Sequence, residues 1–407
     1  MKKKRDLEGN RLHHFELSDK NRTVRWVLVI TLLAVAAISL ITGLLSLLQT
    51  PAGWHTVKGS STGLNCGGEF VLQYEYGAGE NSATAESKAL EPLYGKAVED
   101  AWKLFFNEAG ATDLTGLYAI NQHPNEEVTV DSSLYLALAQ IVSSRALYLA
   151  PVYAEYDRIF YSDSESIARE YDPGQNGDQR AYVQTLADFA KNPQAVQLVL
   201  LGSNKVMLQV SQEYLSFAKE NEIRFLLDFG WLRNAFIVDY IASVLTDNGF
   251  TNGHISSIDG FTRNLDQRGN SYSLNLFNRY EDGIDLAAVM DYTAPKSLVI
   301  MRNYPMYALE SKRYYSFSDG RIVTAMIDPV DGQSKTATNN LVSYSANLSC
   351  GQLALSVMPI YVADVFSEDA LNALTKQNIY SVWFTGKQLM YNQNDLKLTV
   401  NDPYYTN

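Results

Sequence analysis

Hydrophobic residues are distributed along this 407-residue chain in two different ways. Near the N-terminus they form one run, residues 26–48, which contains 23 residues without a charge. A helix rises about 1.5 Å per residue, so this run is long enough to cross a hydrocarbon core of roughly 30 Å. Further along the chain, hydrophobic residues recur with the short periods that are typical of half-buried helices and strands.

The uninterrupted run predicts an uncleaved membrane-spanning helix rather than a signal peptide. The apolar part of a signal peptide usually has about 7 to 15 residues and ends at a small-x-small site, which residues 49–51 do not provide. Residues 1–25 carry eight basic and four acidic side chains. The positive-inside rule therefore predicts a basic cytoplasmic tail at 1–25 and an extracytoplasmic C-terminal part. On this interpretation the protein is a single-pass protein of the cell membrane that contacts the lipid bilayer through residues 26–48.

Beyond residue 48 the pattern predicts a flexible linker at 49–64, a folded domain at 65–400 and a C-terminal tail at 401–407. Helices are expected at 85–108, 132–150 (with Asp131 as its N-cap), 239–248 and 353–366, and strands at 70–76, 196–201, 206–210, 271–277, 297–301, 314–317 and 321–326. The segment 162–192 is polar and contains turn signals. Helices and strands do not alternate with a regular period, which predicts an α+β fold rather than a doubly wound sheet.

The net charge of the chain limits the kinds of molecule that it is expected to bind. The whole chain has a net charge of -12, and the part after residue 25 has 25 basic and 41 acidic residues, a net charge of -16. Phosphate backbones are bound by clustered Lys and Arg, so nucleic acid is excluded as a partner of this acidic part.

The chain has two cysteines, Cys66 and Cys350. In an oxidising compartment they could pair, but two cysteines so far apart permit a disulfide without requiring one. There is no Cys-x-x-Cys motif, and the five histidines lack the spacing of metal ligands, so no structural zinc site is expected at His13, His14, His55, His123 or His254.

One stretch resembles the signature of a known family. Residues 228–239 read Asp-Phe-Gly-Trp-Leu-Arg-Asn-Ala-Phe-Ile-Val-Asp, and a further helix is followed by Ile-Asp-Gly at 258–260. This is similar to the Asp-Leu-Gly-Gly-Ile-Ala-Lys-Gly-Tyr-Ala-Val-Asp signature of the FAD:protein FMN transferase (ApbE) family. Residues 117–121 and 327–332 also resemble the family's Leu-Asn segment and its Ile-Asp-Pro-x-Thr-Gly turn. The order and spacing of these motifs agree over roughly residues 65 to 400.

The resemblance implies an ApbE-like α+β domain that binds FAD and a divalent metal, usually magnesium. Family members transfer the FMN half of FAD to a Thr or Ser of a partner protein, here a flavin-acceptor or electron-transfer protein, and release AMP. Such phosphoryl chemistry depends on positioning and on a metal that neutralises charge. The resemblance makes Asp228 the best candidate for a catalytic residue and places the cofactor-binding positions at Asn121, Asp228, Gly230, Asn234, Asp239, Asp259, Gly260 and Asp328.

The sequence departs from the family where the chemistry occurs. The metal-binding Asp and Thr of the family fall on Gly351 and Leu355, which offer no hard oxygen ligand from a side chain. The lysine and glycine of the signature fall on Asn234 and Ala235, so a positive charge and a close backbone approach are lost. Three further family positions, an Asp, a Gly and a His, fall on Leu149, Tyr153 and Ala325.

These departures predict that no metal is bound, although Asp364 and Ser356 lie close enough in sequence to offer a rearranged site. Three hypotheses follow. The domain is catalytically degenerate and binds a flavin, a nucleotide or a partner protein. Alternatively, it is an active, divergent flavinyltransferase, or it is a structural scaffold without a ligand.

Overall fold

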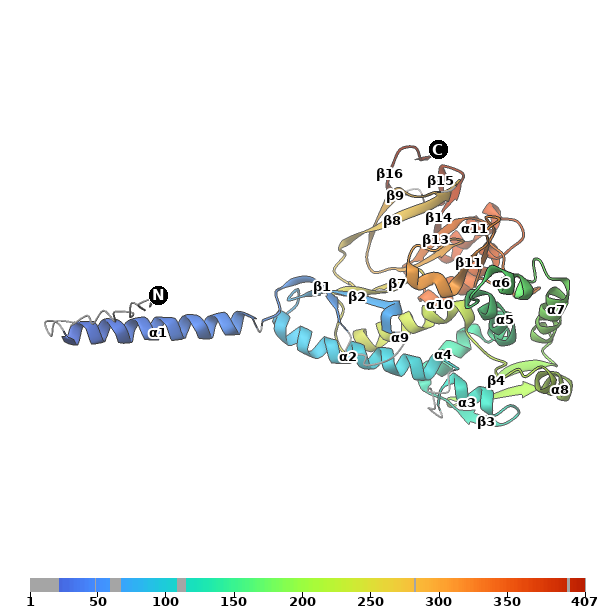
Figure 1. Cartoon of the computed structure of the whole chain (residues 1–407), viewed down its shortest axis with the longest axis horizontal. Helices are drawn as coiled ribbons and strands as arrows, with labels where there is room; N and C mark the ends of the chain where they lie inside the picture. The colour runs from blue at the N-terminus through green and yellow to red at the C-terminus, as the bar shows by residue number, and fades with distance from the viewer. Residues whose placement is uncertain are drawn as a thin grey trace, which may run out of the picture. The chain divides into compact units, whose positions relative to one another are not determined.

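The computed structural model describes residues 22–47, 49–58, 67–107, 115–281, 283–393 and 396–406. Contacts divide the chain into two compact units, residues 1–51 and 52–407. Figure 1 colours the chain from the N-terminus to the C-terminus and labels the helices and strands. The predicted basic tail lies mostly outside the described residues, as does Cys66.

The first unit contains the helix α1 (Arg22–Leu47). Within the described part of the chain, no helix is both long enough and apolar enough to cross a membrane. This finding overturns the prediction of a single-pass membrane protein with a spanning helix at 26–48 and an extracytoplasmic domain.

The second unit is built on a sheet of nine described strands in the order β1-β2-β6-β7-β10-β13-β14-β15-β17. Their bounds are β1 (Gly53–Val57), β2 (Phe70–Tyr76), β6 (Gly253–Ser257), β7 (Phe261–Asn264), β10 (Ser297–Arg302), β13 (Asn340–Ser345), β14 (Tyr380–Thr385), β15 (Gln388–Tyr391) and β17 (Tyr405–Thr406). Neighbouring strands pair antiparallel except β15 and β17, which are parallel. This topology confirms the predicted α+β class. Residues 53–57, inside the predicted linker, form β1.

Three helices form the main core against this sheet. They are α2 (Ala83–Phe105), α9 (Arg233–Asp247) and α10 (Cys350–Tyr361). α9 contacts β6 and β7 as well as α2 and α10, while α2 contacts β1 and β2, and α10 contacts β10 and β13. α2 begins at the N-cap Ser82, whose side chain accepts a hydrogen bond from the N–H of Ala85, and it buries the stripe Leu90, Tyr94 and Val98.

A helical region with its own small sheet follows α2 in the chain. Its elements are α3 (Leu117–Gln122), β3 (Glu127–Thr129), α4 (Ser132–Ile141), α5 (Ala150–Phe160), α6 (Glu165–Tyr171), α7 (Gly177–Lys191), β4 (Val196–Gly202), β5 (Lys205–Val210) and α8 (Gln212–Glu220). The strands form a sheet in the order β3-β5-β4. Asp131 caps α4 as predicted, because its carboxylate accepts a hydrogen bond of 2.7 Å from the N–H of Ser133.

Two sequence predictions in this region need correction. The helix expected at 132–150 is split into α4, the 3-10 helix η2 (Arg145–Tyr148) and the start of α5. The polar segment 162–192 contains the helices α6 and α7, whose N-caps are Ser164 and Asn176. α7 buries one apolar stripe, which the polar majority of the segment conceals in the sequence.

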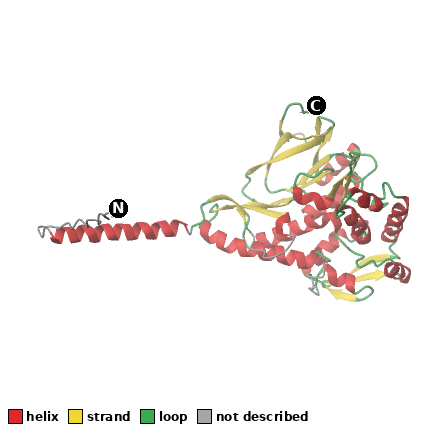
Figure 2. Ribbon diagram, in the orientation of Figure 1, coloured by secondary structure: helices red, strands yellow, loops and turns green. Residues whose placement is uncertain are grey.

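The chain ends in a second, smaller core. β8 (Ser271–Tyr280), β9 (Gly283–Thr293) and β16 (Lys397–Val400) form a sheet in the order β16-β9-β8, and its buried side chains pack against the far strands of the main sheet. Figure 2 shows this sheet as strands and loops beside the C-terminus. The remaining elements are η1 (Gly67–Glu69), η3 (Gly230–Leu232), η4 (Ala308–Arg313), β11 (Tyr314–Ser316), β12 (Ile322–Thr324), α11 (Glu368–Ala373) and η5 (Leu374–Gln377).

Cys350 is a free, fully buried thiol at the start of α10, and its Sγ donates to the carbonyl of Thr262 over 3.1 Å. Burial raises the pKa of this thiol well above its ordinary value. Both properties make the cysteine a packing residue rather than a nucleophile.

Candidate functional site

A cleft of 360 Å³ lies in the second unit, between α5 and the segment 312–327. Eight aromatic side chains line it, from Trp102, Phe106, Tyr153, Tyr156, Phe160, Tyr161, Phe225 and Trp231. The charged side chains that line it are Glu69, Asp157, Asp228, Arg233, Lys312 and Arg313. Aromatic walls with a few charged groups are typical of sites for planar organic ligands.

Asp228 is the most heavily bonded charged group of the cleft. Its Oδ1 accepts hydrogen bonds of 2.6 Å from the N–H of Gly230 and from Nη2 of Arg233. Its Oδ2 accepts bonds of 2.8 Å from Arg233 and from the amide of Asn107. The guanidinium of Arg233 also lies 4.2 Å from the ring centre of Phe106. Asp228 is therefore a neutralised, structural carboxylate that holds an arginine over an aromatic ring.

Asn121 lies behind Asp228 and does not line the cleft. Its Oδ1 accepts bonds of 2.9 Å from the backbone N–H groups of Leu226 and Leu227. Its Nδ2 donates to the carbonyl of Leu227 over 3.0 Å and to Oδ1 of Asn107 over 2.8 Å. Asn121 is buried and fixes the backbone that precedes Asp228, which is a positioning role.

Asn234 and Asp259 belong to a second cluster, together with Glu69 and Arg313. Nδ2 of Asn234 donates to Glu69 over 2.8 Å and to Asp259 over 3.2 Å. Arg313 lies 2.8 Å from Asp259 and 3.3 Å from Glu69. Burial alone would lower the pKa of Arg313, but Asp259 and Glu69 more than offset this, so its pKa is raised. Position 234 carries no charge in this chain, and Arg313 supplies a positive charge from a distant segment.

Gly230 and Gly260 both have backbone conformations that favour glycine. Gly260 has φ +101°, and a Cβ there would lie 2.3 Å from the carbonyl oxygen of Ile300. Gly230 has φ +57°, and a Cβ there would lie 2.3 Å from the ring of Tyr153. Gly260 is thus required by the close approach of β10, whereas Gly230 lies against an aromatic side chain in the cleft.

Asp239 and Gly351 meet at the start of α10, and neither lines the cleft. The carboxylate of Asp239 accepts bonds of 2.8 Å from the N–H groups of Cys350 and Gly351, so it caps α10 rather than its own helix. Burial raises the pKa of Asp239, although these N–H groups oppose the rise. A Cβ at Gly351 would lie 2.7 Å from the ring of Phe236. The space for a side chain at position 351 is therefore taken by an aromatic ring.

Replacing Gly351 with alanine should lower the free energy of unfolding by about 1 to 2 kcal/mol, because overpacking against Phe236 outweighs the gain in helix propensity. Urea denaturation of the wild type and of Gly351→Ala measures the loss. In a Phe236→Leu background, Gly351→Ala should lower the free energy of unfolding by a smaller amount, since the aromatic ring that the new Cβ would meet is absent. An equal loss in both backgrounds would show that the ring is not the obstacle.

Asp328 lies in a turn next to Lys335, not in the cleft. The ammonium of Lys335 lies 3.1 Å from Asp328, 2.6 Å from Asp331 and 2.7 Å from Asp364. Burial alone would lower the pKa of Lys335, but the three carboxylates raise it. Asp364 is therefore paired with an ammonium, and the hydroxyl of Ser356 donates to the carbonyl of Gln352 over 2.9 Å. Among the described residues, no group of three His, Cys, Asp or Glu side chains is arranged to hold a metal ion.

Asp157 is a cleft carboxyl that the sequence did not single out. It is exposed at the open side of the cleft, beside the aromatic side chains of α5. Desolvation in the cleft raises the pKa of Asp157 to about 6, while Arg233 lowers it and Asp228 raises it by smaller amounts. Asp157 can therefore exchange a proton with a ligand near neutral pH.

Replacing Asp157 with asparagine should stabilise the protein at pH 7 by about 1 kcal/mol, since solvent at the open side of the cleft screens much of the shift. The folded pKa of about 6 lies above the ordinary aspartate pKa of 3.8, so the ionised carboxyl is unfavourable in the folded state above pH 6. The advantage of Asp157→Asn should shrink as the pH falls from 6 and vanish below about pH 4. Melting temperatures of both proteins between pH 4 and 8 measure this, and a constant difference would contradict it.

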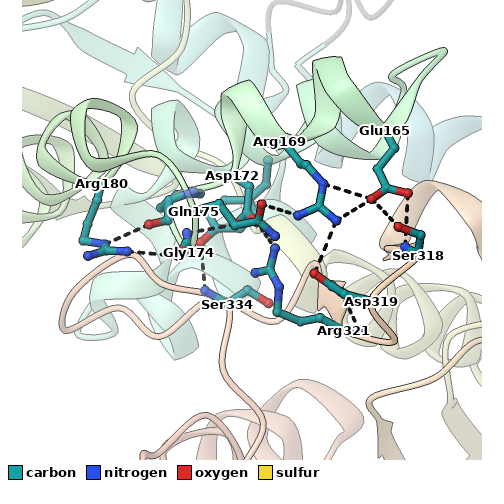
Figure 3. A network of polar contacts seen from close by, with 12 residues as sticks. Glu165, Arg169, Asp172, Gly174, Gln175, Arg180, Ser318, Asp319, Arg321 and Ser334 are labelled. Atoms are coloured by element: carbon teal, nitrogen blue, oxygen red, sulfur yellow. Dashed lines mark hydrogen bonds and ion pairs between the residues drawn. The ribbon is translucent and has the colours of Figure 1, made fainter.

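A polar network connects α6 and the residues after it to the turn at 317–321 (Figure 3). Arg169 of α6 bonds to Glu165 and lies 3.3 Å from Asp319, and Glu165 accepts from the hydroxyl of Ser318 over 2.8 Å. Arg321 pairs with Asp172 and, like Arg169, lies over the ring of Phe317. Because α6 follows α5 and residues 317–321 join β11 to β12, the network fixes one wall of the cleft against the other.

The structure brings two of the eight predicted cofactor positions, Asp228 and Gly230, to the cleft wall. The other six do not line the cleft, and their assignment as cofactor-binding positions stays a prediction. Residues that the sequence did not identify as parts of the site are Glu69, Phe106, Asn107, Asp157, Arg233 and Arg313. Arg233 could have been found, because it is charged and lies inside the recognised signature.

Comparison with known proteins supports the fold. The chain matches no protein-family model and no curated protein. It is similar to the crystal structure of the ApbE protein of Thermotoga maritima, with a TM-score of 0.53 and 11% identity over 84% of this chain and 96% of that one. It is also similar to a mutant of the flavin transferase ApbE of Vibrio cholerae, with a TM-score of 0.51 and 12% identity over 86% and 98% of the two chains. The second unit therefore has an ApbE-like α+β fold.

Proposed function

We propose that this protein binds a flavin in the aromatic cleft and does not transfer FMN to other proteins. The observation that carries the proposal is the cleft itself, in which Arg233 is held over Phe106 by Asp228 on an ApbE-like fold. A partner protein of the electron-transfer kind is part of the proposal.

The cleft residues suit a flavin. The isoalloxazine ring is planar and can stack on the aromatic side chains of the wall. Trp231 Nε1 and Arg233 Nε are buried and have no hydrogen-bond partner among the described residues. The ring oxygens and nitrogens of a flavin are acceptors for such donors, and leaving buried donors unpaired is costly. When bound, a flavin would supply electron-transfer chemistry, and Arg233, Trp231 and the aromatic wall would hold and shield its ring.

The residues do not suit magnesium. Magnesium requires oxygen ligands in a nearly octahedral arrangement. At position 351 the chain has no side chain, and the ring of Phe236 takes the space that a carboxylate would need. Asp364, the alternative ligand considered from the sequence, is paired with Lys335. These contacts support a domain that has lost metal-dependent transfer.

A fluorescence titration of the full-length protein tests the proposal. Riboflavin and FMN should show saturable quenching that does not change when magnesium is added. Phe106→Ala should weaken this binding at least tenfold, whereas Tyr405→Ala, which removes an exposed aromatic residue outside the cleft, should not. Absence of quenching would favour the scaffold hypothesis.

A transfer assay separates the proposal from the hypothesis of an active flavinyltransferase. The protein is incubated with FAD, magnesium and a flavin-acceptor domain, and an active ApbE enzyme serves as the positive control. We expect a fluorescent acceptor band with the control enzyme and none with this protein. A fluorescent band from this protein would refute the loss of transfer.

A further inference from the structure

Tyr153 occupies space beside the backbone of Gly230. The two residues line the cleft together, and a Cβ at Gly230 would lie 2.3 Å from two ring atoms of Tyr153. Glycine with a positive φ usually allows another group to approach the backbone closely. At Gly230 that group is the Tyr153 ring, so a ligand cannot take the same place.

The position of the Tyr153 ring is fixed. Its hydroxyl donates a hydrogen bond of 2.8 Å to the carbonyl of Ala146, and its backbone N–H bonds to the carbonyl of Leu149 over 2.9 Å. Burial, followed by the nearby charge of Asp228, raises the pKa of Tyr153 far above its ordinary value. The phenol therefore remains a neutral donor at every physiological pH, and the ring is a permanent part of the wall.

The cleft that remains suits a ligand with one anionic group. Its 360 Å³ is near the lower end of the range of about 300 to 1,000 Å³ for small-molecule sites. Asp228 neutralises Arg233, and Asp259 and Glu69 neutralise Arg313. Lys312 is exposed, lies 5.5 Å from the ring centre of Tyr161, and makes no ion pair with the residues that the structure describes.

We infer that Tyr153 makes the cleft selective for a flavin mononucleotide over the dinucleotide, with Lys312 at the mouth as the partner of its single phosphate. The inference rests on the proposed function and deepens it. The isoalloxazine ring fills the aromatic part of the cleft, and the phosphate reaches Lys312. The adenosine half of FAD finds no room, because the Tyr153 ring takes the volume beside Gly230 that a smaller residue would leave open.

Calorimetric titration of the full-length protein with FMN, FAD and riboflavin tests the inference. The wild type should bind FMN at least tenfold more tightly than FAD. Tyr153→Gly and Tyr153→Leu should gain affinity for FAD and bring this ratio close to one. Tyr153→Phe keeps the ring and should keep the selectivity. Lys312→Gln should lower the affinity for FMN several-fold. It should leave the affinity for riboflavin unchanged, since riboflavin has no phosphate.

The outcomes separate this inference from the proposed function. Equal affinities of the wild type for FMN and FAD would overturn the inference alone. An unchanged preference for FMN over FAD in Tyr153→Leu would also overturn the inference alone. This variant keeps an apolar side chain for packing, so it serves as the test if Tyr153→Gly does not fold. Absence of binding of every flavin would overturn the proposed function, and the inference with it.

Discussion

Replacing Asp228 with alanine should abolish flavin binding and lower the free energy of unfolding by about 3 kcal/mol. The change leaves the guanidinium of Arg233, the N–H of Gly230 and the amide of Asn107 without the acceptor that all three share. The side chains of Asp228 and Arg233 are 13% and 22% exposed, so the loss should fall at the lower end of the range for buried pairs. Without the carboxylate, Arg233 is also no longer held over Phe106.

Urea denaturation measures the loss of stability, and flavin titration measures the loss of binding. Asp228→Asn keeps the shape and one acceptor oxygen but removes the charge, so it should lose less stability than alanine. Asp188→Ala is a matched control, because Asp188 forms an exposed ion pair with Lys191 and should change stability by no more than about 0.5 kcal/mol. A loss below about 1 kcal/mol in Asp228→Ala would show that the three donors find other acceptors.

Much of the α+β class could be predicted from the sequence, because periodic apolar residues mark elements that bury one face. β2 occupies the residues that alternation predicts, 70–76, and β4, β5, β8 and β10 lie within a few residues of their predicted places. The sequence did not predict those strands whose position depends on contacts with distant segments of the chain. β13 is buried at every position and has no alternation, and β1 is an edge strand in a segment whose composition is typical of a linker.

The site was less predictable, because its geometry depends on contacts between distant segments. The resemblance predicted that the family's glycine falls on Tyr153 and that its aspartate falls on Gly351. It did not show that the Tyr153 ring lies against Gly230, nor that the Phe236 ring lies against Gly351. Arg313 belongs to no motif, and its pairing with Asp259 and Glu69 brings together the turn between β6 and β7, η1 and η4. Only the folded chain shows which neighbouring residue takes the space or supplies the charge at each of these positions.

Replacing Arg313 with methionine should lower the free energy of unfolding at pH 7 by about 3 to 5 kcal/mol, the largest loss that we expect from a single change near the cleft. The carboxylate of Asp259 is 7% exposed and that of Glu69 is 28% exposed, and both face Arg313. The amide of Asn234 lies between them and donates to each, but a neutral amide cannot balance two negative charges. Methionine keeps the volume of the arginine stem, so the loss reports charge rather than packing.

Matched substitutions identify the cause of this loss. Arg313→Lys keeps a positive charge and should lose less, while Arg224→Met, at an exposed arginine, should lose little. Urea denaturation at pH 7 measures all three variants. A loss in Arg313→Lys as large as that in Arg313→Met would contradict the explanation by charge, and position 234 would then have lost its charge without replacement.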